Sequence, residues 1–218
     1  MNKRKKLAIA VGVLTRQDGS VLMAKRPKDK SYAGFWEFPG GKVNKNELLV
    51  TALARELKEE LDVKIEGAIP WLTRRFNLGD VELILNFFKV YQWQGEPTAI
   101  EGQDLVWQDP GEITVSPVLP ANKRVLEFLK LPLIYGITNA SSLGKIHFSK
   151  VFAQAIKQGL NFIQIRDKTL SYNAREDLVA EIVKKSKEIG GISIVNEDFN
   201  LAKKYKADGV HLPSALLS

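Results

Sequence analysis

Two short runs decide the fold of the first part of the chain: GKVNKNE at residues 41–47 and, seven residues later, RELKEE at residues 55–60. Apolar residues between and beyond them recur every three or four positions, which predicts a helix over residues 47–61. On that helix Glu56, Glu59 and Glu60 share one face. We therefore expect their carboxylates to converge while the leucines face the core.

Three carboxylates on one helical face repel one another, because each opposes the ionisation of its neighbours. A hard divalent cation relieves this repulsion, and Mg²⁺ prefers a few carboxylates together with water and substrate phosphate oxygens. In the preceding loop, Gly40 and Gly41 let the backbone approach a ligand closely. Arg55 is placed to pair with Glu47 and to hold the acidic groups in position. The alternative is a solvated charged face, which is the commoner meaning of a Glu-rich helix.

The spacing argues against that alternative, because it resembles the Nudix box: Gly, five residues, Glu, seven residues, then Arg-Glu-aliphatic-any-Glu-Glu. Six coincident positions arise by chance on the order of once per ten million starts. Asp62 departs from the family pattern, which has glycine there. Asp is among the residues that adopt the left-handed backbone of a helix end most easily after Gly. We interpret Asp62 as a tolerated substitution.

The resemblance extends over nearly all of residues 5–130, to the MutT-type hydrolases of oxidised nucleotides, through the segments AVGVL, MAKRP, FWEFPGGK, WQGEP and LPAN. It implies a Nudix α/β/α sandwich over residues 1–131 and hydrolysis of 8-oxo-dGTP to the monophosphate and pyrophosphate. It also implies Mg²⁺ as cofactor, with Mn²⁺ as a substitute. The implied catalytic residues are Glu47, Arg55, Glu56, Glu59, Glu60 and Glu101. The implied metal site is Gly41, Glu56, Glu59, Glu60 and Glu101. The implied substrate-binding residues are Arg26, Phe38, Gly40, Gly41 and Asn122.

The role of Asn122 has two interpretations. The resemblance implies that Asn122 recognises the oxidised purine, and an Asn side chain offers both a donor and an acceptor to a purine edge. Asn after Pro-Ala is also an ordinary helix N-cap. We favour the purine role because the other matches accompany it.

Beyond residue 131 strands and helices alternate regularly, which predicts βαβ units and a parallel sheet. We expect strands at 133–138, 162–166, 192–196 and 209–212, and helices at 148–158, at 175–189 and from 201. Residues 132–218 resemble the first half of the thiamine-phosphate synthase and thiazole tautomerase family, a TIM barrel, through LIYGITN, QIRDK, IVN and ADGVHL.

That resemblance implies a partial (β/α) TIM-barrel-like unit. Polar residues at strand ends hold ligands in such barrels, so a pyrimidine phosphate or related anion would bind at Gln164, Arg166, Lys168 and Asn196. The family's Asn-Asp pair reads Asn-Glu at residues 196–197, and four strands are half of a barrel. We expect a remnant or truncated barrel that self-associates through its open edges, with His147 and His211 in structural roles.

Composition and charge argue against several other classes of function. The chain has 218 residues, a net charge of +7, no Cys, and dispersed Lys and Arg. We therefore expect no stable nucleic-acid binding, no thiolate metal site and no membrane span. Absence of Cys is compatible with a cytoplasmic location, which we expect. The basic run near the start followed by LAIAVGVL is better explained by a strand, Asp-Gly turn and second strand than by a secretory signal.

The sequence therefore predicts a Mg²⁺-dependent nucleoside triphosphate pyrophosphohydrolase that acts on 8-oxo-dGTP. Two alternatives stay open. One is hydrolysis of another diphosphate, such as a thiamine-pathway compound. The other is a regulatory module that binds a nucleotide without turnover.

Overall fold

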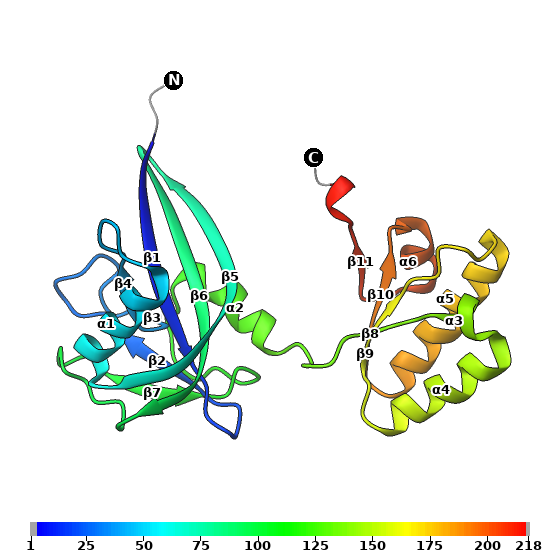
Figure 1. Cartoon of the computed structure of the whole chain (residues 1–218), viewed down its shortest axis with the longest axis horizontal. Helices are drawn as coiled ribbons and strands as arrows, with labels where there is room; N and C mark the ends of the chain where they lie inside the picture. The colour runs from blue at the N-terminus through cyan, green and yellow to red at the C-terminus, as the bar shows by residue number, and fades with distance from the viewer. Residues whose placement is uncertain (1–3, 217–218) are drawn as a thin grey trace. The chain divides into compact units, whose positions relative to one another are not determined.

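The computed structural model describes residues 4–216. The chain divides into two compact units between Lys130 and Leu131, one residue before the expected boundary. Figure 1 shows the elements of both units, which we describe separately. Among the described residues, no helix combines the length and apolar character needed to cross a bilayer.

The first unit contains two sheets. The larger has the strand order β4-β1-β6-β5, with β1 and β6 parallel and the other two pairs antiparallel. Its strands are β1 (Lys5–Leu14), β4 (Gly40–Lys42), β5 (Lys64–Leu78) and β6 (Val81–Gln94). The smaller is antiparallel, with order β3-β2-β7. Its strands are β2 (Val21–Lys25), β3 (Trp36–Glu37) and β7 (Leu105–Gln108).

Two helices complete the first unit, α1 (Leu49–Leu61) and α2 (Pro120–Leu129). Successive side chains of a strand point to opposite faces of its sheet, and β1 accordingly contributes to two cores. Ala10 and Leu14 pack in one cluster with the apolar stripe of α1. Val11 and Val13 pack in the other with Val125 and its neighbours on α2. The larger sheet thus lies between helices, which confirms the sandwich.

The hairpin expected from the Asp-Gly turn is only partly correct. The turn forms, with the Arg16 N–H donating to the Ser20 carbonyl at 2.9 Å. The two flanking strands then separate, and only Thr15 and Val21 form a bridge. The reason is that β4 and β6 occupy both edges of β1, so β2 pairs in the other sheet.

Helix α1 begins at Leu49, two residues later than expected, and ends as the sequence predicted. Asp62 takes the left-handed conformation, with φ of 55°, and its N–H donates to the Lys58 carbonyl. This conformation is the one that the family's glycine would supply. The departure at Asp62 therefore leaves the helix end in place.

The second unit has one parallel sheet of order β11-β10-β9-β8. Its strands are β8 (Gly136–Ile137), β9 (Phe162–Ile165), β10 (Ile192–Asn196) and β11 (Gly209–His211). Its helices are α3 (Ala140–Leu143), α4 (Lys145–Lys157), α5 (Tyr172–Glu188) and α6 (Phe199–Tyr205), with a short 3-10 turn at Ser214–Leu216. Parallel neighbours joined by helical crossovers confirm a partial barrel unit.

Candidate active site

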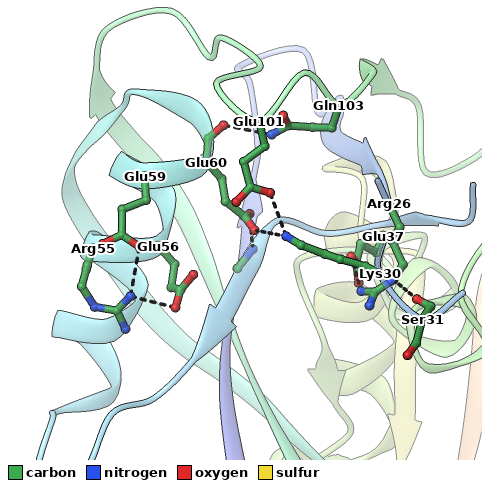
Figure 2. Close-up of polar contacts among 11 residues, drawn as sticks. Arg26, Lys30, Ser31, Glu37, Arg55, Glu56, Glu59, Glu60, Glu101 and Gln103 are labelled. Carbon is green, nitrogen blue, oxygen red and sulfur yellow. Dashed lines mark hydrogen bonds and ion pairs between the residues drawn. The ribbon is translucent and has the colours of Figure 1, made fainter. Parts of the chain in front are cut away.

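An arginine on α1, Arg55, binds three acidic side chains, and Figure 2 draws two of them, Glu56 and Glu59. Arg55 binds Glu47 through two hydrogen bonds of 3.0 Å, as the sequence predicted. Its Nη1 also donates to Glu56 at 2.8 Å and to Glu59 at 3.2 Å. These bonds hold the pKa of Arg55 above its ordinary value, and the Arg55 hydrogen bond is the main cause of the lowered pKa of Glu47.

Glu60 lies apart from this arginine network. Its Oε2 accepts a hydrogen bond of 3.0 Å from the Gly40 N–H, and its side chain is 15% exposed. Burial disfavours the charged form and raises the pKa of Glu60 to about 7, against the lowering effects of the Gly40 N–H and of Lys30. Glu60 therefore titrates near neutral pH, which few carboxyl groups do.

Glu101 reaches Glu60 from a loop that follows β6. The Ile100 N–H and the Gln103 side chain both donate to the Glu60 carbonyl, at 3.2 and 2.9 Å, and dock this loop on the end of α1. Lys30 then joins the two acidic side chains, with its Nζ 2.7 Å from Glu101 Oε2 and 3.9 Å from Glu60 Oε1. Burial lowers the pKa of Lys30, but the bond to Glu101 and both negative charges outweigh it and raise that pKa overall.

The expectation that three carboxylates converge is therefore wrong in part. Glu56 and Glu59 share Arg55, whereas Glu60 points toward Glu101 and Lys30 (Figure 2). Within residues 4–216, no group of three or more acidic or His side chains is close enough to hold a metal ion. The physical reason is that two cations of the chain neutralise the carboxylates and separate them into two groups.

Of the expected substrate-binding side chains, Arg26 is paired with an acidic residue and Phe38 is buried in the core. Arg26 forms a hydrogen-bonded ion pair with Glu37 and donates to the Ser31 carbonyl at 2.7 Å. Phe38 is 2% exposed and packs edge-on against Phe87 in the core, so its ring is not available to stack on a base. Gly40 places the N–H that binds Glu60.

Asn122 lies in the first turn of α2 and is 4% exposed. The N-cap of α2 is Leu119, and Pro120 opens the helix. The interpretation of Asn122 as an N-cap is therefore wrong, and the purine role stays a prediction.

In the second unit the expected ligand residues gather at the carboxyl ends of the strands. Gln164 donates to Asn196 at 3.1 Å. A cavity of about 270 Å³ is lined there by Arg166, Lys168 and Asn196, together with Glu197. Lys168 lies 3.8 Å from Glu197, the residue that departs from the family pattern, so part of the cationic lining is already paired.

Comparison with known proteins identifies both units. A model of the NUDIX domain matches residues 10–128, more than half of the chain. The chain belongs to the Nudix family. A model of thiamine monophosphate synthase matches residues 134–217, which identifies the second unit as a thiamine-phosphate synthase-like region.

The Nudix unit resembles several bacterial hydrolases. An 8-oxo-dGTP diphosphatase of Proteus vulgaris is 39% identical over 47% of this chain and 91% of its own. A CTP pyrophosphohydrolase of Escherichia coli is 34% identical over 56% of this chain and 90% of its own. A crystal structure of a MutT Nudix hydrolase from Burkholderia pseudomallei superposes with a TM-score of 0.52, at 26% identity, over 56% of this chain and 97% of that one.

The second unit resembles a protein of Aquifex aeolicus provisionally named thiamine-phosphate synthase 2. The two are 32% identical over 39% of this chain. The chain spans 45% of the length of that relative.

Nudix proteins typically use a divalent metal. The chemistry of the donors in this Nudix unit fits one, while Arg55 and Lys30 hold the carboxylates in two separate groups. The donors around β4 are carboxylate oxygens, which hard cations prefer. Lys30 already places a positive charge between Glu60 and Glu101. A permanent positive charge nearby would favour the charged form of the buried Glu60, which burial disfavours. A Cβ on Gly41 would lie 2.1 Å from an oxygen of Glu56, so glycine is what lets Glu56 lie against this strand.

Sequence reasoning did not find Lys30, Glu37 or Gln103. Glu37 is buried beside Arg26, and this burial raises its pKa against the attraction of the guanidinium. The Nε2 of Gln103 donates to the Glu60 carbonyl and so anchors the Glu101 loop. The Oε1 of the same side chain is buried and has no hydrogen-bond partner. Glu37 lies in the segment FWEFPGGK, but only the fold shows that it pairs with Arg26 and that Gln103 binds α1.

Proposed function

We propose that the Nudix unit is a Mg²⁺-dependent nucleoside triphosphate pyrophosphohydrolase whose substrate is 8-oxo-dGTP. The observation that carries this proposal is the meeting of Glu60 and Glu101 beside Gly40, next to the arginine network of Glu47, Glu56 and Glu59. The resemblance of the unit to an 8-oxo-dGTP diphosphatase supports the substrate.

In this mechanism Glu56, Glu59, Glu60 and Glu101 hold the divalent ion, and Gly41 contributes to its site. When bound, the ion activates water and offsets charge on the phosphate oxygens. Arg55 and Glu47 keep the helix carboxylates in position through their paired hydrogen bonds. The carboxylates also supply the acceptor for the proton of the attacking water. Asn122 and Arg26 recognise the nucleotide.

Pyrophosphate release tests the proposal. We would compare 8-oxo-dGTP, dGTP and CTP, each with and without Mg²⁺. The account predicts Mg²⁺-dependent release with 8-oxo-dGTP as the preferred substrate. Equal rates on 8-oxo-dGTP and dGTP would remove the claim of preference for the oxidised base, and faster release from CTP would reassign the substrate.

Glu59→Gln separates catalysis from folding. The Glu59 side chain is 58% exposed, so its loss should leave stability unchanged while turnover falls by about 10² or more. Glu127→Gln is the matched control, because Glu127 is 63% exposed on the other helix of the unit. Unchanged turnover in Glu59→Gln would refute its metal role. Absence of metal-dependent release from any nucleotide would support a binding module without turnover.

A second candidate substrate class is favoured by the second unit. The match of residues 134–217 to thiamine monophosphate synthase makes a thiamine-pathway diphosphate a reasonable substrate of the same acidic site. Phosphate release from thiamine diphosphate under the same conditions tests it. Release faster than from any nucleotide would replace the leading proposal.

A further inference from the structure

Lys30 lies in the loop between β2 and β3 and connects two acidic residues from distant elements. Its Nζ donates to Glu101 at 2.7 Å and lies 3.9 Å from Glu60. The Lys30 side chain is 39% exposed, so it reaches these carboxylates from solvent. The contact therefore involves a flexible cation and two proposed metal ligands.

Other cations nearby are already paired. Arg55 is bound to Glu47, Glu56 and Glu59, and Arg26 is bound to Glu37. Among the residues that the structure describes, Lys30 is the one cation in an ion pair with Glu60 or Glu101. Lysine suits such a reversible role, because its ammonium is a compact point charge on a flexible stem.

An ammonium between two carboxylates affects a divalent ion in two ways. It occupies the oxygens that the ion needs, and its positive charge repels the ion at close range. It also keeps Glu60 and Glu101 from repelling each other before metal arrives.

We propose that Lys30 is the resident counter-ion of Glu60 and Glu101, which holds them together in the metal-free protein and competes with the divalent ion for their oxygens. This inference rests on the proposed function, which makes these two residues metal ligands. Removal of the ammonium should strengthen metal binding and weaken the metal-free fold. A residue that merely supports the fold would change stability without strengthening metal binding.

The test is a Mn²⁺ titration of the full chain without nucleotide, in which the electron paramagnetic resonance signal reports free Mn²⁺. Lys30→Met should bind Mn²⁺ about fivefold more tightly than the natural protein, given the size of partly exposed ion pairs. Lys30→Arg keeps the charge and should bind within about twofold of the natural protein. Lys28→Met is the matched control, because it removes one positive charge from an exposed position in the same loop.

A second measurement is thermal unfolding in EDTA. Lys30→Met should unfold at a lower temperature than Lys28→Met, because Glu60 and Glu101 then lack their counter-ion. An equal or weaker affinity of Lys30→Met for Mn²⁺, with the natural protein binding normally, would overturn the inference and leave the proposed function intact. Absence of Mn²⁺ binding by every variant would overturn the proposed metal site, and the inference with it.

Discussion

Glu60→Gln should change how the stability of the Nudix unit depends on pH. The pKa of Glu60 rises from 4.5 to about 7 on folding, mainly through burial. A folded pKa above the unfolded one favours the protonated form in the native state. The contribution of Glu60 to the free energy of unfolding is therefore fully present below pH 4.5, and it is lost as the pH rises through 7.

The size of the effect follows from the shift. A difference of about 2.5 pKa units corresponds to about 3 kcal/mol in the free energy of unfolding. Gln keeps an oxygen that can accept the 3.0 Å hydrogen bond from the Gly40 N–H, and it has no charge to desolvate. In metal-free buffer the natural protein should thus lose about 3 kcal/mol relative to Glu60→Gln between pH 4.5 and pH 8.

Urea unfolding in EDTA, followed by tryptophan fluorescence, measures this difference. All four tryptophans, at positions 36, 71, 93 and 107, belong to the Nudix unit, so the signal reports that unit alone. Glu127→Gln controls for the loss of a surface charge. A constant stability difference between the natural protein and Glu60→Gln from pH 4.5 to pH 8 would refute the argument from burial.

Two further substitutions test the surroundings of the acidic residues. Gly40→Ala should destabilise the Nudix unit by about 3 kcal/mol or more, because its Cβ would lie 2.2 Å from the Ala10 carbonyl oxygen. Gly79→Ala, also at positive φ but with open space around it, should cost about 1 kcal/mol in the same urea assay, and equal losses would contradict the steric argument. Arg55→Ala should lower the urea midpoint at pH 7, because Arg55 holds the pKa of Glu47 below 4.5. That stabilisation is present above pH 4.5 and is lost as the pH falls through the folded pKa of Glu47. The difference in urea midpoint between Arg55→Ala and the natural protein should therefore be smaller at pH 3 than at pH 7. A difference of equal size at both pH values would count against the Arg55–Glu47 pair.

Residue spacing within one stretch of sequence predicted the elements that depend on neighbouring residues alone. Helix α1 and its end at Asp62 follow from spacing along one helix, and the pairing of Arg55 with Glu47 joins that helix to the residues just before it. Strand β5 did not follow, because bulges between Ile65 and Ala68, and near Pro70, break the alternation that marks a strand.

Contacts between distant segments were beyond local patterns. The parallel pairing of β1 with β6 joins residues more than 70 positions apart, and no spacing within either strand specifies its partner. The same holds for Lys30, which meets Glu101 only after both loops are placed on α1. The spacing rule placed the carboxylates and Arg55 on one helix but gave no sign of Lys30, which pairs with Glu60 and Glu101, and the expected convergence of three carboxylates was therefore wrong in part.

The central claim is that the carboxylates around residues 56–60 and Glu101 hold a divalent ion against the phosphates of a nucleotide. Anomalous diffraction from crystals grown with Mn²⁺ and a non-hydrolysable triphosphate tests it most directly. The account predicts an anomalous peak at coordination distance from oxygens of Glu60 and Glu101, with Lys30 moved away and Arg55 still bound to Glu47. A peak elsewhere, with Lys30 still between the two carboxylates, would contradict it.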